Sequence, residues 1–369
     1  MNDQPGIPLR GIDHVRFFVG NARQSAYFYR NAFGFEVVAY EGLETRVRHE
    51  AAYVLRQGAI TFVLASPLHA NHPDAQRLLT HGDGVQDIAL EVEDVGDSYQ
   101  LAIDRGAVGV SPPRTLVDEY GTFDCATIGV YGDTTHTFVN RDRYTGIFAP
   151  GYKPIEPSRY STSTARPAGL RAIDHIVANV EEGQMKRWVG FYADVLGFHL
   201  LVSFDDKDIS TEYSALMSKV VEDGQGRIKF PINEPAPGRR KSQVEEFLNF
   251  HGGPGVQHIA LATDDIVSSV RALRANDCTF LRVPSAYYEA LGTRVGPIEA
   301  SLDDLEELGI LVDRDEEGYL LQIFTKPVED RPTLFFEIIE RRGAKSFGKG
   351  NFKALFEAIE REQGQRGTL

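Results

Sequence analysis

An internal repeat constrains the fold of this chain more than any other feature of its sequence. Gly11-Ile-Asp-His-Val15 recurs as Ala172-Ile-Asp-His-Ile176, and Gly84-Val-Gln-Asp-Ile-Ala-Leu90 recurs as Gly255-Val-Gln-His-Ile-Ala-Leu261. The two matches keep their order along the chain, with a modest insertion in the second half. Self-similarity at such a long period indicates two structural units of the same kind. Because 369 residues suffice for two or three domains, we predict two homologous halves.

Within each half the pattern predicts an α+β fold. A short apolar strand precedes an amphipathic helix, and several further strands follow, for example over 59–64, 258–262 and 320–324. The segment 149–169 is rich in Pro, Ser and Thr, which is typical of a surface linker. We therefore predict an N-terminal domain over 1–148, a linker over 149–169 and a C-terminal domain over 170–369.

The last segment of the chain predicts a closing amphipathic helix over 351–362. Its apolar residues Phe352, Leu355, Phe356 and Ile359 have spacings that place them on one helical face.

Charge and cysteine content exclude several classes of protein. The net charge is −14, which repels nucleic acid and anionic lipid surfaces, so neither partner is expected. Cys125 and Cys278 are too few for a disulfide framework or a thiolate zinc site. We found no apolar run of transmembrane length and no secretory leader pattern. A cytoplasmic location is therefore expected.

Three residues of the second half form a candidate metal site, namely His175, His258 and Glu337. Glu337 lies within the apolar run 335–339, where a charged group is costly to bury unless it is paired or metal-bound. Taken one at a time, these residues also fit core hydrogen bonding for the histidines and an outward-facing edge position for Glu337. Together they form the ligand set of non-haem Fe(II) oxygenases, although catalytic zinc uses the same set.

The first half provides an internal comparison for this site. It keeps His14, but Asp87 stands where the second half has His258, and Thr137 stands where it has Glu337. We therefore expect the first half to hold no catalytic metal. The histidines His49, His69, His72, His81, His199 and His251 match no ligand pattern, and we expect them to be surface or structural residues.

A series of long motifs in the second half closely resembles the 4-hydroxyphenylpyruvate dioxygenase family. The resemblance covers nearly the whole chain and is densest from His175 to Glu362. The motifs are 230–236, 241–243, 255–261, 309–315, 320–327, 330–337 and 347–352.

The resemblance implies a vicinal-oxygen-chelate (VOC; glyoxalase/bleomycin-resistance-like) fold, in which paired βαβββ modules form half-open barrels. It implies one Fe(II) per chain in the C-terminal barrel, held by His175, His258 and Glu337. It also implies a substrate pocket, with catalytic roles for Gln243, Gln257, Gln322 and Phe352 and substrate-binding roles for Ser214, Asn233, Phe324, Phe335, Phe347 and Asn351. Without the resemblance, the glutamines fit ordinary strand or surface polarity, and the phenylalanines fit ordinary core packing.

The expected activity is the Fe(II)-dependent conversion of 4-hydroxyphenylpyruvate and O2 to homogentisate and CO2, in tyrosine and phenylalanine catabolism. One alternative is the sister activity, 4-hydroxymandelate synthase. Phe352 and Asn233 argue against it, because that branch tends to carry smaller or different residues there. A second alternative is a non-catalytic VOC protein that only binds a small molecule. A homo-oligomer, dimer or tetramer, is expected.

Overall fold

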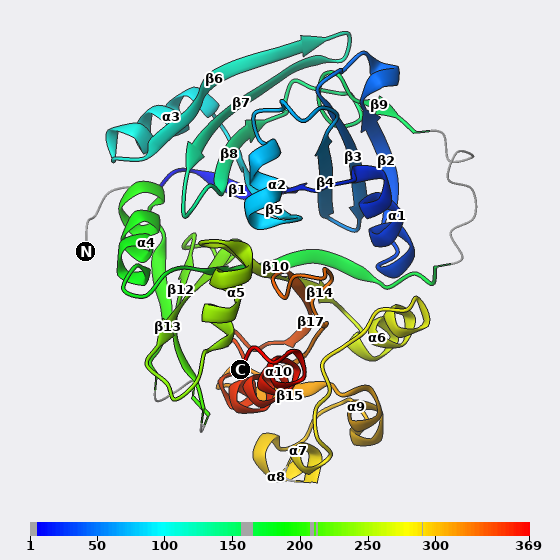
Figure 1. The fold of residues 1–369 in the computed structure, drawn as a ribbon, viewed down its shortest axis with the longest axis vertical. Helices are drawn as coiled ribbons and strands as arrows, with labels where there is room; N and C mark the ends of the chain where they lie inside the picture. The colour runs from blue at the N-terminus through cyan, green and yellow to red at the C-terminus, as the bar shows by residue number, and fades with distance from the viewer. Residues whose placement is uncertain (1–5, 156–164, 207–209, 212, 290) are drawn as a thin grey trace.

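The strands of the protein form two large sheets, one from each half of the chain (Figure 1). Within the described residues, the N-terminal sheet has nine strands and the C-terminal sheet has eight. This computed structural model describes residues 6–155, 165–206, 210–211, 213–289 and 291–369.

The strands of the N-terminal sheet are β1 (Leu9–Phe18), β2 (Glu36–Glu41), β3 (Glu50–Gln57), β4 (Ile60–Pro67), β5 (Gly84–Val92), β6 (Val108–Asp118), β7 (Gly121–Gly129), β8 (Thr135–Asn140) and β9 (Lys153–Pro154). Those of the C-terminal sheet are β10 (Leu170–Asn179), β11 (His199–Phe204), β12 (Ala215–Glu222), β13 (Lys229–Ala236), β14 (Gly255–Thr263), β15 (Leu311–Arg314), β16 (Tyr319–Phe324) and β17 (Phe335–Arg342).

The α-helices are α1 (Ala22–Ala32), α2 (Ala75–His81), α3 (Val95–Asp104), α4 (Met185–Phe191), α5 (Gln243–His251), α6 (Ile266–Ala275), α7 (Ala286–Glu289), α8 (Leu291–Val295), α9 (Leu302–Leu308) and α10 (Phe352–Arg366). Short 3₁₀ turns occupy Leu43–Thr45 (η1) and Lys349–Asn351 (η4), and a π-helical turn occupies Tyr192–Leu196 (η3). Among the described residues, no helix combines the length and the apolar character needed to cross a membrane.

The strand order repeats between the halves, as the sequence repeat predicts. The N-terminal order is β6-β7-β8-β5-β1-β4-β3-β2-β9, and the C-terminal order is β11-β12-β13-β10-β14-β17-β16-β15. In each sheet the first strand of the half pairs parallel with the fourth strand and antiparallel with the fifth. Each half therefore consists of two βαβββ modules, which confirms the predicted fold class.

The two halves share an apolar core between their sheets. Successive side chains of a strand point to opposite faces, so β17 buries Phe336 and Ile338 on one face and turns Glu337 to the other. The ring of Phe336 contacts Phe33 and Tyr29 of the N-terminal half, with centroid separations of 4.8 Å and 5.8 Å.

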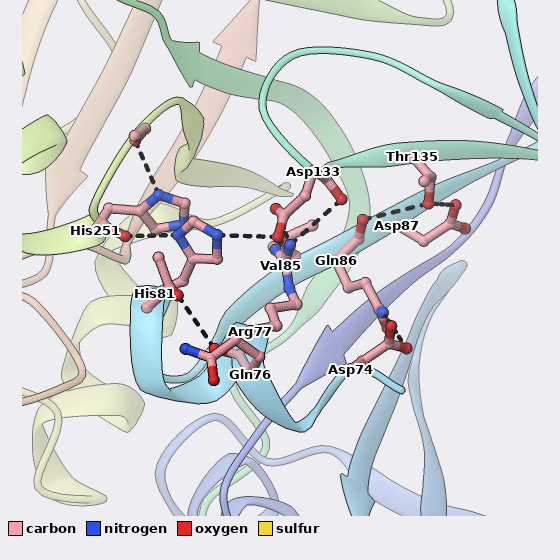
Figure 2. Close-up of polar contacts among 12 residues, drawn as sticks. Asp74, Gln76, Arg77, His81, Val85, Gln86, Asp87, Asp133, Thr135 and His251 are labelled. Atoms are coloured by element: carbon pink, nitrogen blue, oxygen red, sulfur yellow. Dashed lines mark hydrogen bonds and ion pairs between the residues drawn. The ribbon is translucent and has the colours of Figure 1, made fainter. Parts of the chain in front are cut away.

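A polar network also joins the halves, at the ends of α2 and α5. His81 and His251 stack with their ring centroids 4.3 Å apart, and His81 Nδ1 lies 2.6 Å from the His251 carbonyl oxygen. His81 Nε2 contacts Asp133, which also pairs with Arg77 (Figure 2). These histidines are buried and have a structural role, in line with the sequence expectation.

The segment predicted as a linker is only partly an unpaired connection. Lys153 and Pro154 form β9, which pairs with β2 at the edge of the N-terminal sheet. Residues 156–164 of the predicted linker lie outside the described part of the chain. The closing helix predicted over 351–362 is observed as α10, which begins at Phe352, one residue later, and continues to Arg366, one turn beyond the predicted end.

Candidate metal centre

Three neighbouring strands bring together the predicted metal ligands. In the sheet register, His175 of β10 lies opposite Ala260 of β14, and Ala260 lies opposite Glu337 of β17. His258 is two residues before Ala260 on the same strand, so all three side chains point to the same face of the sheet.

The three side chains converge within a few ångströms of one another. His175 Nε2 lies 3.1 Å from Glu337 Oε2, and His258 Nε2 lies 3.5 Å from the same oxygen. One ligand atom from each residue lies within 4.8 Å of the other two, and all three residues are buried. Within the described ranges, no other group of three or more His, Cys, Asp or Glu residues reaches this proximity.

The electrostatics of the cluster keep Glu337 ionised. Burial alone would raise the pKa of Glu337, but His175 and His258 lower it below its usual value. Burial opposes a charge on His175, but the carboxylates of Glu337 and Asp174 outweigh it and raise the pKa of His175. Burial lowers the pKa of His258. A buried carboxylate facing two imidazole nitrogens is a donor set that suits a divalent transition metal.

Two β-bulges orient the ligand histidines. The register of β10 and β14 skips Asp174 on one strand and Gln257 on the other, so each is the extra residue beside a ligand histidine. Asp174 Oδ2 lies 2.7 Å from His175 Nδ1, and Gln257 Oε1 lies 3.1 Å from His258 Nδ1. A histidine that donates from Nδ1 keeps its Nε2 lone pair free for a metal.

The cluster lies at the floor of a cavity that encloses about 590 Å³ of space not filled by atoms, part of it open to solvent. Eight of the ten residues predicted for the pocket line it, namely Asn233, Gln243, Gln257, Gln322, Phe324, Phe335, Phe347 and Phe352.

The structure places Ser214 outside the cavity, and this corrects the sequence assignment. The Ser214 hydroxyl donates to Glu360 of α10 at 2.6 Å. The serine that lines the cavity is Ser218, which lies opposite Asn233 in the β12–β13 pair. The two serines are four residues apart and the strand register decides between them, so the sequence motif alone could not identify Ser218.

Asn351 is also absent from the cavity lining. It is buried at the start of α10, where its Oδ1 accepts a hydrogen bond from Tyr287 Oη at 2.6 Å. Its Nδ2 has no hydrogen-bond partner among the described residues, and the substrate-binding role of Asn351 stays a prediction.

Gln322 lines the cavity and carries a buried polar atom that has no partner among the described residues. It is only 2% exposed, and its Oε1 has no hydrogen-bond partner among the described residues. Gly348 stands directly above it with φ of +75°, and a Cβ at that position would lie 2.6 Å from this oxygen. The positive φ favours glycine at position 348, and it lets the Gln322 amide approach the backbone closely.

The corresponding position of the N-terminal half has a different chemistry. His14 occupies the place of His175, but Asp87 there accepts hydrogen bonds from Thr135 and Thr137. Thr137 lies opposite Ala89, just as Glu337 lies opposite Ala260, which confirms the predicted equivalence of Thr137 and Glu337.

Comparison with known proteins agrees with this architecture. A family model described as the Glyoxalase/Bleomycin resistance protein/Dioxygenase superfamily matches residues 11–135 and 172–323, one segment in each half.

Curated relatives match nearly the full chain. The 4-hydroxyphenylpyruvate dioxygenase of Dictyostelium discoideum is 48% identical over 98% of this chain and 100% of its own. That of Caenorhabditis briggsae is 48% identical over 100% of this chain and 95% of its own. Among solved structures, a mutant of 4-hydroxymandelate synthase from Streptomyces coelicolor is 33% identical, covers 97% of this chain and 100% of its own, and superposes with a TM-score of 0.86.

Proposed function

The chain belongs to the 4-hydroxyphenylpyruvate dioxygenase family of the glyoxalase/bleomycin resistance/dioxygenase superfamily, and from this premise we propose the reaction and the residues that carry it out. The reaction is the conversion of 4-hydroxyphenylpyruvate and O2 to homogentisate and CO2 in tyrosine catabolism. We assign the reaction to the cavity because His175, His258 and Glu337 converge there.

The donor set fits one Fe(II) per chain. Two neutral imidazoles and one carboxylate leave coordination positions open for an oxo acid and dioxygen. When bound, Fe(II) supplies the electron-transfer chemistry through which dioxygen reacts with the oxo acid. Glu337 would offset part of the charge of the ion in a buried site.

The cavity walls suit a phenolic oxo acid. The amides of Gln243, Gln257 and Gln322 can each donate or accept a hydrogen bond without taking a charge into an apolar space. The aromatic rings are placed to contact the substrate ring, and Phe335 stacks on His258 with centroids 4.7 Å apart. These groups would position the substrate above the metal ligands.

We expect helix α10 to shield one side of the cavity from water. Phe352, Leu355 and Phe356 of this helix line the cavity, and the ring of Phe352 contacts that of Phe204 across it at 4.9 Å. Exclusion of water protects the reactive species and strengthens electrostatic interactions in the site.

The proposed reaction is balanced. The carboxyl group of the oxo acid leaves as CO2, and the keto carbon becomes the new carboxyl group with one oxygen atom from O2. The other oxygen atom becomes a ring hydroxyl, and the side chain moves to the neighbouring ring carbon.

The sister activity, 4-hydroxymandelate synthesis, is the alternative that the structural similarity to that enzyme keeps open. It uses the same substrate but hydroxylates the benzylic carbon. The curated relatives, which have higher sequence identity to this chain than that structure has, are named 4-hydroxyphenylpyruvate dioxygenase. This favours homogentisate as the product. A non-catalytic binding protein is disfavoured by the complete ligand set.

The experiment is metal reconstitution followed by product analysis. We expect the purified protein loaded anaerobically with Fe(II) to consume O2 upon addition of 4-hydroxyphenylpyruvate and to release homogentisate, as identified by chromatography. Glu337→Gln should lose iron and turnover, because it loses the charged ligand. Glu340→Gln is the matched control, since Glu340 is buried on the same strand but donates no ligand atom to the cluster. Full iron content and turnover in Glu337→Gln would contradict the assignment.

The remaining parts of the proposal concern organisation. The half over 1–148 would act as a metal-free scaffold and the half over 170–369 as the catalytic domain. The protein would work in the cytoplasm as a homo-oligomer, which sedimentation analysis can test.

A further inference from the structure

The ligand His175 is the first of three linked ionisable groups, followed by Asp174 and Arg341. Asp174 Oδ2 lies 2.7 Å from His175 Nδ1. Arg341 holds the same carboxylate in a bidentate pair, with Nε donating to Oδ1 at 2.7 Å and Nη2 donating to Oδ2 at 2.9 Å. The Asp174 side chain is only 9% exposed, so the pair is shielded from solvent.

The N-terminal half contains the same chain of groups. Asp13 Oδ1 lies 2.5 Å from His14 Nδ1, and Arg141 donates to both oxygens of Asp13 at 2.6 Å and 2.7 Å. Asp13, like Asp174, is the extra residue of a β-bulge beside its histidine. The arrangement is therefore a feature of the repeated module.

Both arginines also hold the segment that follows the last strand of the second module in their half, β8 or β17. Arg341 donates to the carbonyls of Ala344 and Ser346 and lies over the Phe347 ring, whereas Arg141 donates to the carbonyl of Phe148 and lies over the Phe148 ring. The histidine of each half meets that phenylalanine edge-on at 5.1 Å. The structural role of the chain is thus common to the two halves.

The two halves differ in the residues that face the Nε2 side of this histidine. His175 Nε2 faces Glu337, whereas Thr137 occupies the position of Glu337 in the N-terminal half. The effect of the aspartate on the histidine can therefore matter to a metal in one half only.

We propose that Asp174, fixed by Arg341, is a positioning residue that sets the tautomer and orientation of His175 for metal binding. By accepting the Nδ1 hydrogen of His175, Asp174 leaves the Nε2 lone pair directed at the position between His258 and Glu337. This inference deepens the proposed function. It rests on that function because it requires the site to hold a metal ion.

The physical reason is the fixed direction of the hydrogen bond. Metal-bound histidines commonly donate their second ring N–H to a carboxylate or carbonyl group, and loss of that partner typically weakens metal binding about 10- to 100-fold. In Asp174→Asn, the amide can offer its NH2 group to Nδ1, which forces the ring proton to Nε2 and blocks the ligand position. His258 relies on the neutral amide of Gln257 for the same purpose, so the two ligands are oriented by different chemistry.

The test measures metal binding directly, with Asp13→Asn as the matched control. Wild type, Asp174→Asn and Asp13→Asn are titrated with Fe(II) under anaerobic conditions against a competing chelator, and with Co(II), whose visible absorption reports the coordination geometry. We expect Asp174→Asn to lose about 10- to 100-fold in Fe(II) affinity and to change the Co(II) spectrum. Asp13→Asn should keep the wild-type affinity and spectrum, while thermal unfolding without metal should show a similar loss of stability in both variants.

A further variant keeps the test falsifiable if Asp174→Asn does not fold. Asp174→Glu retains the carboxylate, so its Fe(II) affinity should exceed that of Asp174→Asn. If Asp174→Asn is unfolded, the Fe(II) affinity of Asp174→Glu should still be measurable. The Co(II) spectrum of Asp174→Glu should resemble that of wild type. Wild-type affinity in Asp174→Asn, equal losses in Asp174→Asn and Asp13→Asn, or a loss in Asp174→Glu as large as that in Asp174→Asn would overturn the inference. Failure of the wild type to bind either ion would instead overturn the proposed function.

Discussion

At the scale of single residues, neighbouring side chains of β17 point to opposite faces of the sheet and have different surroundings. Phe336 and Ile338 pack between the halves, whereas Phe335 and Glu337 face the cavity. Because side chains alternate along a strand, neighbouring residues of β17 contribute to the interface between the halves and to the candidate metal centre. A substitution that shifts Phe336 is therefore expected to disturb Glu337 as well.

Replacement of Phe352 by Ile should change the product. Phe352 lines the cavity and packs against Phe204, so we expect its ring to hold the substrate ring toward the metal ligands. Loss of this planar wall costs about 1 to 3 kcal/mol in a packed site, enough to reweight two close substrate poses. Chromatography should detect 4-hydroxymandelate beside reduced homogentisate, with unchanged iron content. Homogentisate alone at the native rate would show that Phe352 does not steer the ring.

Protonation of His136 should destabilise the fold in acid. His136 is buried between the halves, with Nδ1 3.0 Å from the Ile88 carbonyl oxygen and Nε2 2.9 Å from Tyr192 Oη. Burial lowers the pKa of His136 to about 4, against a partial rise from the Ile88 carbonyl. The unfolded chain, with an ordinary histidine pKa of about 6.5, then binds more protons between these two values, so stability falls as the pH drops through this window.

The size of this effect is about 3 kcal/mol at most, from the difference of the two pKa values. Urea unfolding of wild type and His136→Gln at several pH values from 7 to 4 would measure it, with His199→Gln at an exposed position as the control. Of the two variants, only His136→Gln should show a shallower dependence of stability on pH. The dependence should not vanish, because burial also lowers the pKa of His251, which contributes in the same direction. Equal slopes in all three proteins would contradict the role of His136.

At the level of elements, α10 combines an apolar face with ion pairs to neighbouring elements. Phe356 and Ile359 pack against the barrel, as their spacing predicts. Arg366 pairs with Glu246 of α5 at 2.8 Å, and Lys326 pairs with Glu362 at 2.9 Å. The C-terminal turns of the helix are thus fastened by ion pairs to two other parts of the C-terminal half.

Replacement of Glu360 by Ala should loosen α10. Glu360 is buried and accepts hydrogen bonds from the hydroxyls of Ser214 and Thr211, so its removal leaves two hydroxyl groups without their acceptor. We expect a loss of about 1 to 3 kcal/mol in the free energy of unfolding, together with faster proteolytic release of the C-terminal segment. The control is Lys353→Ala, at an exposed position of the same helix. The same proteolysis rate in both variants would refute the anchoring role.

At the scale of the whole molecule, two copies of one architecture carry different chemistry. The N-terminal half has the strand order and the aspartate–histidine–arginine chain of the other half. Among the described residues, however, the only group of three ligand side chains lies in the C-terminal half. The N-terminal half instead contributes aromatic and histidine side chains that pack against the C-terminal sheet.

The metal stoichiometry should therefore be one ion per chain. His14→Ala should leave this value and the Fe(II) affinity unchanged, at the cost of some stability, because it removes the packing of His14 against Phe148. Elemental analysis of wild type and His14→Ala after Fe(II) reconstitution is the measurement. Two ions in the wild type that fall to one in His14→Ala would overturn the assignment of a single site.

The sequence by itself determined the repeat, the α+β modules, the apolar face of α10 and the candidate ligands His175, His258 and Glu337. These features depend on local periodicity and on residue types in a recurring pattern, both of which are written along the chain. The tertiary structure decided that Ser218 and not Ser214 lines the cavity, because the register of β12 and β13 selects the residue. It also revealed the buried contact of Glu360 with Ser214 and the pairing of Asp174 with Arg341. Such contacts join residues far apart in the sequence, so they exist only after the sheet has closed and the last helix has packed across it.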